Sequence, residues 1–172
     1  MTKTQKILFN ILFVIAIVAL WYWYSHPIFE LAFKNDDTHS MRVALSHPWY
    51  AFLTEPFAYQ ELSTAHYTPW VLWSHQFDFF LAGDVNKYVF YGHQWLSITL
   101  LIALLSLLAW RISGQMGAAI IALLLLITHP SLFRLLTEND TRHYVEGAIL
   151  VCLSGLAALG WRVKNGFGGF CR

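Results

Sequence analysis

Two acidic segments contain the residues of this sequence that are best suited to chemistry. Asp36 and Asp37 are adjacent at the start of a long polar segment, and Glu138 and Asp140 flank Asn139 much later in the chain. A carboxylate can accept a proton from a hydroxyl nucleophile, or bind a divalent cation through its oxygens. We therefore take Asp36 and Asp37 as candidate catalytic residues. Asp37, Glu138 and Asp140 are the candidate ligands of a divalent cation. We expect the two acidic segments to approach each other, because both follow or precede predicted helices at the same side of one bundle.

Each acidic segment also has a purely structural interpretation. Asp36–Asp37 would serve as the solvated start of a loop, and Asn139 or Asp140 would cap the helix that follows. Arg134 and Arg142 bracket the second segment, and the planar guanidinium of arginine recognises phosphate through paired hydrogen bonds. We predict that both arginines and both acids of this segment support a site for a phosphate-containing substrate. A network of salt bridges is the structural alternative.

The elements that position these residues are predicted to be membrane-spanning helices. The chain is 57% hydrophobic and 12% charged, against roughly 25% charged residues in an average soluble domain. Apolar segments near the ~20 residues that cross a bilayer occur at residues 7–24, 93–110, 117–136 and 144–161. We predict an all-α membrane protein with about four spans, forming a single membrane domain over residues 1–161.

The first of these segments has an alternative interpretation as a signal peptide. A basic start and an apolar run are common to both kinds of segment, but a signal peptide ends in small residues suited to cleavage. Here Ile7–Leu20 is followed by Trp21-Tyr22-Trp23-Tyr24, and large aromatic side chains favour the membrane–water interface. We interpret this segment as an uncleaved anchor helix.

The distribution of charge predicts the orientation in the membrane. With the N-terminus inside, the short inner segments are dense in lysine and arginine, and the acidic residues all fall on the outer side. The positive-inside rule then predicts cytoplasmic termini, a cytoplasmic tail at residues 162–172 and a non-cytoplasmic loop at residues 25–92. The net charge of +1 gives no indication of a nucleic-acid partner, and we expect none.

The outer loop is predicted to contain two helices that lie on the membrane surface. Pro48–Leu53 and Pro69–Ala82 each begin with proline and are rich in aromatic residues, and Gly83 follows the second. Neither is long enough to span a bilayer, and helices of this composition tend to lie in the interface. The eight histidines show no spacing that places two ligands on one helix face, and the two cysteines do not form a disulfide framework.

The order of these parts resembles the N-terminal module of membrane glycosyltransferases of the GT-C type, which use polyprenyl-phosphate-linked mannose or arabinose. The first shared feature is the acidic pair Asp36-Asp37, which lies early in a large outer loop. Further motifs are similar to stretches that begin or end the family's interface helix and later spans. They are His66-Tyr67-Thr68-Pro69-Trp70-Val71-Leu72, Phe80-Leu81-Ala82-Gly83, His129-Pro130-Ser131-Leu132-Phe133 and Glu138-Asn139-Asp140-Thr141-Arg142-His143-Tyr144.

The resemblance implies transfer of a sugar from a polyprenyl-phosphate donor to an acceptor on the outer face of the membrane. Asp36 or Asp37 would be the general base, and Arg142, together with Arg134, would hold the donor phosphate. The chain departs from the family at Thr68, where a proline is usual, at Lys87–Phe90, and in having fewer spans. We therefore expect further helices from a longer C-terminal region or from a partner protein. The alternatives are a non-enzymatic membrane subunit that supports a partner, and a fragment of a transporter.

Overall fold

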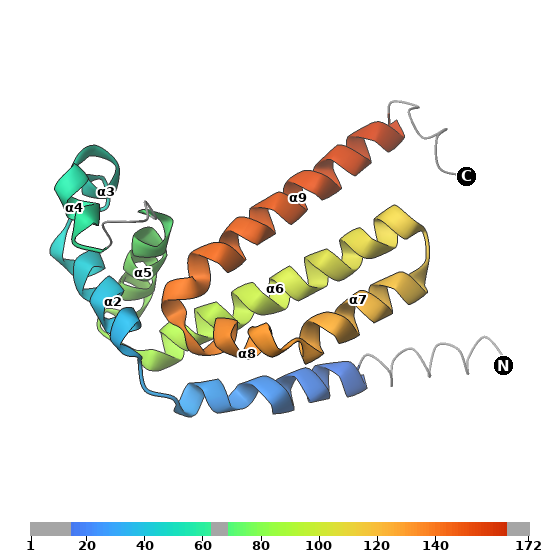
Figure 1. The fold of residues 1–172 in the computed structure, drawn as a ribbon, viewed down its shortest axis with the longest axis horizontal. Helices are drawn as coiled ribbons and strands as arrows, with labels where there is room; N and C mark the ends of the chain where they lie inside the picture. Colours follow the sequence, from blue (N-terminus) through green and yellow to red (C-terminus); the bar gives the residue numbers. More distant parts are fainter. Residues whose placement is uncertain (1–14, 63–68, 165–172) are drawn as a thin grey trace.

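The computed structural model describes residues 15–62 and 69–164, and these form helices joined by short connections, with no β-strand among them. Figure 1 shows the helices in two groups, and the chain passes from one group to the other and back. In chain order they are residues 15–25, η1 (His26–Glu30), α2 (Asn35–Ser46), α3 (Ala51–Thr54), α4 (Pro56–Gln60), α5 (Pro69–Ala82), α6 (Lys87–Ser113), α7 (Met116–Thr128), α8 (Pro130–Thr137), η2 (Asn139–Thr141) and α9 (Arg142–Lys164).

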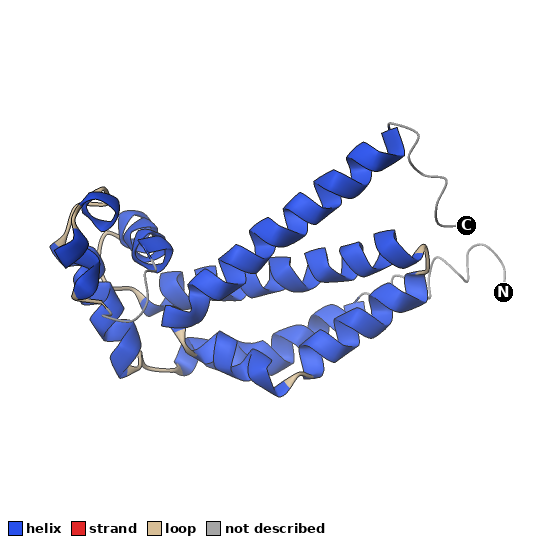
Figure 2. Ribbon diagram, turned by 45° about the horizontal axis from the view of Figure 1, so that its top comes forward, coloured by secondary structure: helices blue, strands red, loops and turns tan. Residues whose placement is uncertain are grey.

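One group is a bundle in which α6 packs against both α7 and α9. The helix at residues 15–25 runs along the same bundle (Figures 1 and 2). Its core is aliphatic and aromatic, and Trp21 is tied to α6 by a hydrogen bond from Nε1 to Thr99 Oγ1 at 2.9 Å. The other group contains α2 to α5 and has a core of its own. That second core consists of Val43, Ala44, Ala51, Phe52, Ala58, Val71 and Leu72.

Two helices are long and apolar enough to cross a membrane, namely α6 and the segment Asn139–Trp161, which includes most of α9. A third span is present if α7 and α8 are counted together, although they are bent by 62°. The bend follows from Pro130, because a proline disfavours helical backbone at the residue before it, and His129 is extended at φ −71° and ψ 128°. The predicted span at residues 117–136 is therefore broken. Of the predicted span at residues 7–24, only residues 15–24 lie in the described part of the chain.

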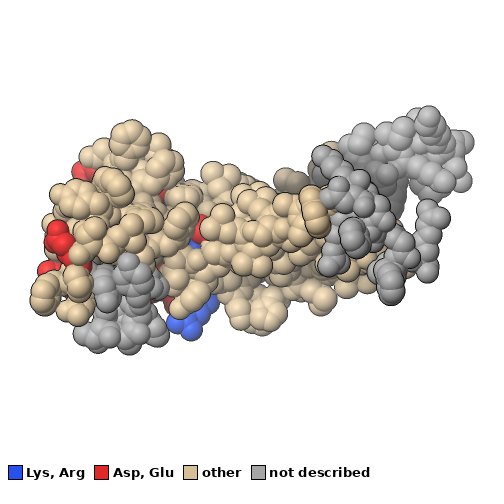
Figure 3. Space-filling view, turned by 90° about the horizontal axis from the view of Figure 1, so that it is seen from above, with Lys and Arg blue, Asp and Glu red and all other residues tan. Residues whose placement is uncertain are grey.

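The charged surface agrees with a membrane location for the bundle. Figure 3 shows acidic side chains gathered at the end formed by the loop helices, whereas the visible described face of the bundle is almost uncharged.

Helix α6 begins six residues earlier than the predicted start at His93, because the side chain of Asn86 caps it by accepting a hydrogen bond from Tyr88 N at 3.0 Å. It ends at Gly114, whose φ of 69° is the left-handed conformation common after a helix.

The loop is more helical than the sequence predicted. Helix α5 matches the predicted Pro69–Ala82, but the predicted helix at Pro48–Leu53 is reduced to Ala51–Thr54. Helix α2 was missed because its first half is polar and the sequence shows no apolar run there. Its N-terminus is stabilised by Asp37, which accepts a hydrogen bond from the backbone of Lys34 in a capping box. Residues 66–68 of the predicted His-Tyr-Thr-Pro motif lie outside the described residues.

Candidate functional site

A cleft of about 280 Å³ lies where the loop helices meet the loop end of the bundle. Asp36 at the start of α2 and Asp140 in η2 both line it, and Arg134 of α8 lies at the same cleft. The cleft thus brings together two carboxylates and one guanidinium from segments that are distant in the sequence. Its remaining lining residues are His39, Ser40, Leu62, Val71, Thr141, His143 and Tyr144.

Asp37 joins the two acidic segments but does not line the cleft. Its side chain is fully buried. Oδ1 accepts a hydrogen bond from Asp140 N at 3.0 Å, and Oδ2 accepts one from Lys34 N at 3.1 Å. Burial raises the pKa of Asp37, while these backbone N–H groups act in the opposite direction. The sequence prediction that the acidic segments approach each other is confirmed, and the contact is direct because Asp37 bonds to the η2 backbone.

Glu138 is held by two cations at the edge of the site. Arg134 Nε donates to Glu138 Oε2 at 2.7 Å, and Lys34 Nζ donates to Glu138 Oε1 at 3.0 Å. The hydrogen bond from Arg134 holds the pKa of Glu138 below its usual value. The Arg134 side chain remains 77% exposed, so its guanidinium is open to a ligand in the cleft. Lys34 was not predicted, because nothing near it in the sequence indicates an acidic partner.

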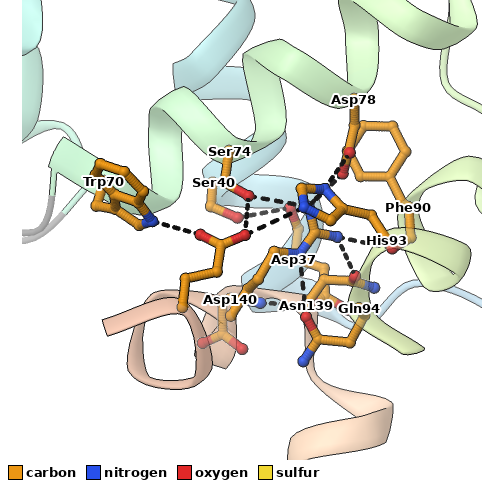
Figure 4. Close-up of polar contacts among 12 residues, drawn as sticks. Asp37, Ser40, Trp70, Ser74, Asp78, Phe90, His93, Gln94, Asn139 and Asp140 are labelled. Atoms are coloured by element: carbon orange, nitrogen blue, oxygen red, sulfur yellow. Dashed lines mark hydrogen bonds and ion pairs between the residues drawn. The ribbon is translucent and has the colours of Figure 1, made fainter. Parts of the chain in front are cut away.

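Arg142 is fully buried in a polar cluster. Figure 4 shows its partners Asp78, Gln94 and Asn139. Neither Arg142 nor its ion-pair partner Asp78 has any exposed side-chain surface. Its Nε and both terminal nitrogens donate hydrogen bonds to groups on α5, α6 and η2, so the guanidinium faces no open space. The acceptors, besides Asp78, are Gln94 Oε1 at 3.0 Å, Ser74 Oγ at 3.2 Å, Phe90 O at 2.7 Å and Asn139 Oδ1 at 2.7 Å.

This geometry assigns Arg142 to the support of the site, and leaves Arg134 as the predicted arginine that a phosphate can reach. It also changes the role of Asn139. The structural interpretation of the sequence was that Asn139 or Asp140 caps the last long helix. Instead the segment forms the short 3-10 helix η2, and the side-chain oxygen of Asn139 accepts a hydrogen bond from the Arg142 guanidinium.

The buried cluster contains residues that the sequence reasoning missed. Asp78 lies in an aromatic run of α5, and its carboxylate contacts both Arg142 and His93 Nδ1, the latter at 2.6 Å. One signal in the sequence pointed to Asp78. It is a single charge among apolar neighbours, and a charge that is buried with them needs a partner. The identity of the partners could not be read from the sequence, because they come from separate helices.

Of the three predicted cation ligands, only Asp140 lines the cleft, since Asp37 is buried and Glu138 bonds to Arg134 and Lys34. Among the described residues no group of three or more His, Cys, Asp or Glu side chains is placed to hold a metal ion. The carboxylates that line the cleft are those of Asp36 and Asp140.

Known proteins provide no assignment for this arrangement. No protein-family model, no curated protein and no solved structure matches the chain. The function is therefore inferred from the cleft, the buried cluster and the two or three helices that are long and apolar enough to cross a membrane.

Proposed function

We propose that the chain is a membrane glycosyltransferase of the GT-C type, or a part of one, which transfers a sugar from a polyprenyl-phosphate donor. The observation that carries this proposal is the cleft in which Asp36, Asp140 and the exposed Arg134 lie together. A carboxylate is suited to the acceptor hydroxyl, and a guanidinium is suited to the donor phosphate.

In the proposed reaction, the acceptor hydroxyl oxygen forms a bond to the anomeric carbon of the donor sugar. The bond between that carbon and the phosphate oxygen breaks, and polyprenyl phosphate leaves with the bonding electrons. Asp36 accepts the hydroxyl proton, and Arg134 stabilises the charge on the leaving phosphate. Asp140 carries a second negative charge in the cleft and orients the acceptor, or shares a divalent cation with Asp36.

The architecture supports a lipid-linked donor. The cleft lies at the loop ends of α8 and α9, and the segments Lys87–Ser113 and Asn139–Trp161 are apolar enough to cross a bilayer. We propose that this end is the non-cytoplasmic side, that the termini are cytoplasmic, and that residues 7–24 complete a set of four spans. In this arrangement a polyprenyl chain would extend along the bundle while its phosphate reaches the cleft.

The second candidate function is a non-enzymatic membrane subunit that supports a partner protein. It is favoured by the apolar surface of α9, where Leu150, Val151 and Leu153 are all exposed. Such a surface contacts either lipid or another helix. The same surface would accommodate the further helices expected for the glycosyltransferase, so an assay of the cleft is needed to separate the two functions.

The test is release of polyprenyl phosphate from a panel of polyprenyl-phosphate sugars by membranes containing the chain. We expect release from at least one donor, and its loss in Asp36→Asn, because the amide cannot accept the proton. Asp84→Asn is the matched control, since Asp84 is an exposed acid between α5 and α6 and does not line the cleft. Equal release by the unmodified chain and by Asp36→Asn would reject the proposed role of the cleft.

A further inference from the structure

A second pocket, of about 270 Å³, lies on another side of α5 from the acidic cleft. Helix α5 contributes one wall, and α6 and α9 contribute the other through His93 and Glu146. The α5 residues are Trp70, Trp73, Ser74 and Phe77. Their spacing places them on one helix face, whereas Val71 from another face of α5 lines the acidic cleft.

The pocket is built mainly from aromatic surface. Trp70 and Trp73 meet edge to face, with ring centroids 6.2 Å apart, and Phe77 packs in the same way on His93 at 5.8 Å. Trp70 and Phe77 are each about half exposed, so this surface is open to a ligand. Large exposed aromatic side chains in such a concave arrangement provide ring faces for a ligand to contact.

One carboxylate, that of Glu146, supplies the charge of this pocket. It accepts hydrogen bonds from Trp70 Nε1 at 2.5 Å and from Ser74 Oγ at 2.9 Å. Both donors therefore point at the carboxylate and not into the pocket. His93 Nε2 lies 3.3 Å from Glu146, which is longer than the 2.6 Å between His93 and Asp78, and Arg142 is paired with Asp78. In the described part of the chain no lysine or arginine pairs with Glu146, and its side chain keeps 12% exposure, so a cation in the pocket can still reach the carboxylate.

We propose that this pocket binds an organic ammonium cation, methylated or quaternary, with Trp70, Trp73 and Phe77 around it and Glu146 as its counter-ion. Aromatic faces attract such cations through the negative charge of the ring face. A sugar ring fits the pocket less well, because the donors around it are already bonded. Trp70 Nε1 and Ser74 Oγ donate to Glu146, and Trp73 Nε1 donates to the Trp49 carbonyl, so many sugar hydroxyl groups would lack partners. A methylated ammonium has no such hydrogen-bonding requirement.

The position of the pocket allows two sources of the cation. Its residues on α6 and α9 lie within the first two turns of those helices, at one end of two membrane-spanning candidates, where lipid head groups meet the protein. The cation is then either the head group of a lipid such as phosphatidylcholine or a free amine such as choline. The chemistry of recognition is the same for both.

The experiment measures the intrinsic tryptophan fluorescence of the full chain, purified in maltoside micelles, as choline chloride is added. Dimethylbutanol, the neutral carbon isostere of choline, is titrated in parallel. We expect a saturable change with choline and a change with the isostere that is at least about tenfold weaker, because only choline carries the charge. No saturable change with choline, or equal responses to both compounds, would overturn the proposal.

Substitutions test whether the fluorescence response to choline comes from this pocket. Glu146→Gln and Trp73→Leu are each expected to weaken choline binding roughly tenfold. The matched controls Glu55→Gln and Trp161→Leu alter exposed residues outside the pocket and should bind as the unmodified chain does. Unchanged binding in both pocket variants would overturn the assignment. If Glu146→Gln fails to fold, as judged by circular dichroism, Trp73→Leu and the isostere titration still decide the matter.

The source of the cation is identified by repeating the titration in lipid nanodiscs. A choline response that is present in phosphatidylglycerol discs and lost in phosphatidylcholine discs supports a lipid head group as the occupant. A response in both kinds of disc supports a free amine. No response in phosphatidylglycerol discs would show that the micelle result was not a property of the protein in a bilayer, and would overturn the proposal.

Discussion

Arg134 and Arg142 lie on either side of η2, and their surroundings are opposite. The side chain of Arg134 is 77% exposed at an open cleft, whereas Arg142 has no exposed surface and is surrounded by acceptors from α5, α6 and η2. The same contrast separates Asp36, which lines the cleft, from Asp37, which is buried. Residues of one type within one short segment therefore divide into a group that holds the helices together and a group that is free for a ligand.

The largest effect should come from breaking the buried ion pair. Asp78→Ala leaves the Arg142 guanidinium buried without its charged partner, which typically costs about 3–5 kcal/mol. We expect a corresponding loss in the free energy of unfolding, measured by chemical denaturation in detergent. Asp84→Ala is the control and should change little, because Asp84 is exposed. Similar stabilities for the two variants would mean that the cluster does not hold α5 to the bundle.

The second comparison is between the neighbouring aspartates. Asp37→Asn should lower stability by about 1–3 kcal/mol, because an amide cannot accept hydrogen bonds at both of its terminal atoms as the carboxylate does. Asp36→Asn, on the exposed side, should stay within about 0.5 kcal/mol of the unmodified chain. Thermal unfolding monitored by circular dichroism measures both. A reversed order would place Asp37, not Asp36, at the open side of the site.

A smaller effect is expected from pH, through His75. Its ring is fully buried, and burial, followed by the nearby charge of Arg142, lowers its pKa well below the usual 6.5. The unfolded chain therefore binds a proton below pH 6.5 that the folded chain does not, so stability falls as the pH decreases. The expected slope from this residue is about 1.4 kcal/mol per pH unit.

The measurement for His75 compares the unfolding free energy of the unmodified chain with that of His75→Phe from about pH 7.5 to about pH 5. The variant should show a smaller loss at acid pH, because phenylalanine does not titrate. Asp37 has the opposite effect on stability. Because its pKa is raised in the folded chain, the folded chain binds a proton more tightly than the unfolded chain, and stability from this residue falls as the pH rises. Parallel pH profiles for the two proteins would show that His75 is accessible to protons in the folded state.

The smallest effect should come from the exposed ion pairs. Glu138→Gln removes the carboxylate that Lys34 and Arg134 share, but exposed ion pairs contribute little and are screened by salt. We expect a change in the denaturation midpoint smaller than for Asp78→Ala or Asp37→Asn, and no difference from the unmodified chain at high salt. A large loss of stability that does not depend on salt would mean that Glu138, like Asp37 and Arg142, holds the helices together.

The sequence was informative where its pattern was local. The apolar runs that became α6 and α9 and the proline-initiated α5 followed from composition and chain order. The approach of the two acidic segments followed instead from the predicted topology, which places both at one end of the bundle. Helix α2 was missed because its burial depends on packing against α5, which no local pattern reports. The burial of Arg142 was missed for the same reason, because Asp78 and Gln94 reach it from other helices.

Binding of farnesyl phosphate to the unmodified chain and to two cleft variants tests the central claim most directly. If Asp36 and Arg134 face one phosphate-binding cleft, Arg134→Gln should weaken binding roughly tenfold through loss of a charge-assisted hydrogen bond. Asp36→Asn should strengthen it a few-fold, by about 2–5 times, because a repelling charge is removed. Arg111→Gln, at the other end of α6, should bind normally. Equal affinities for all four proteins, or no binding at all, would contradict the assignment of the cleft.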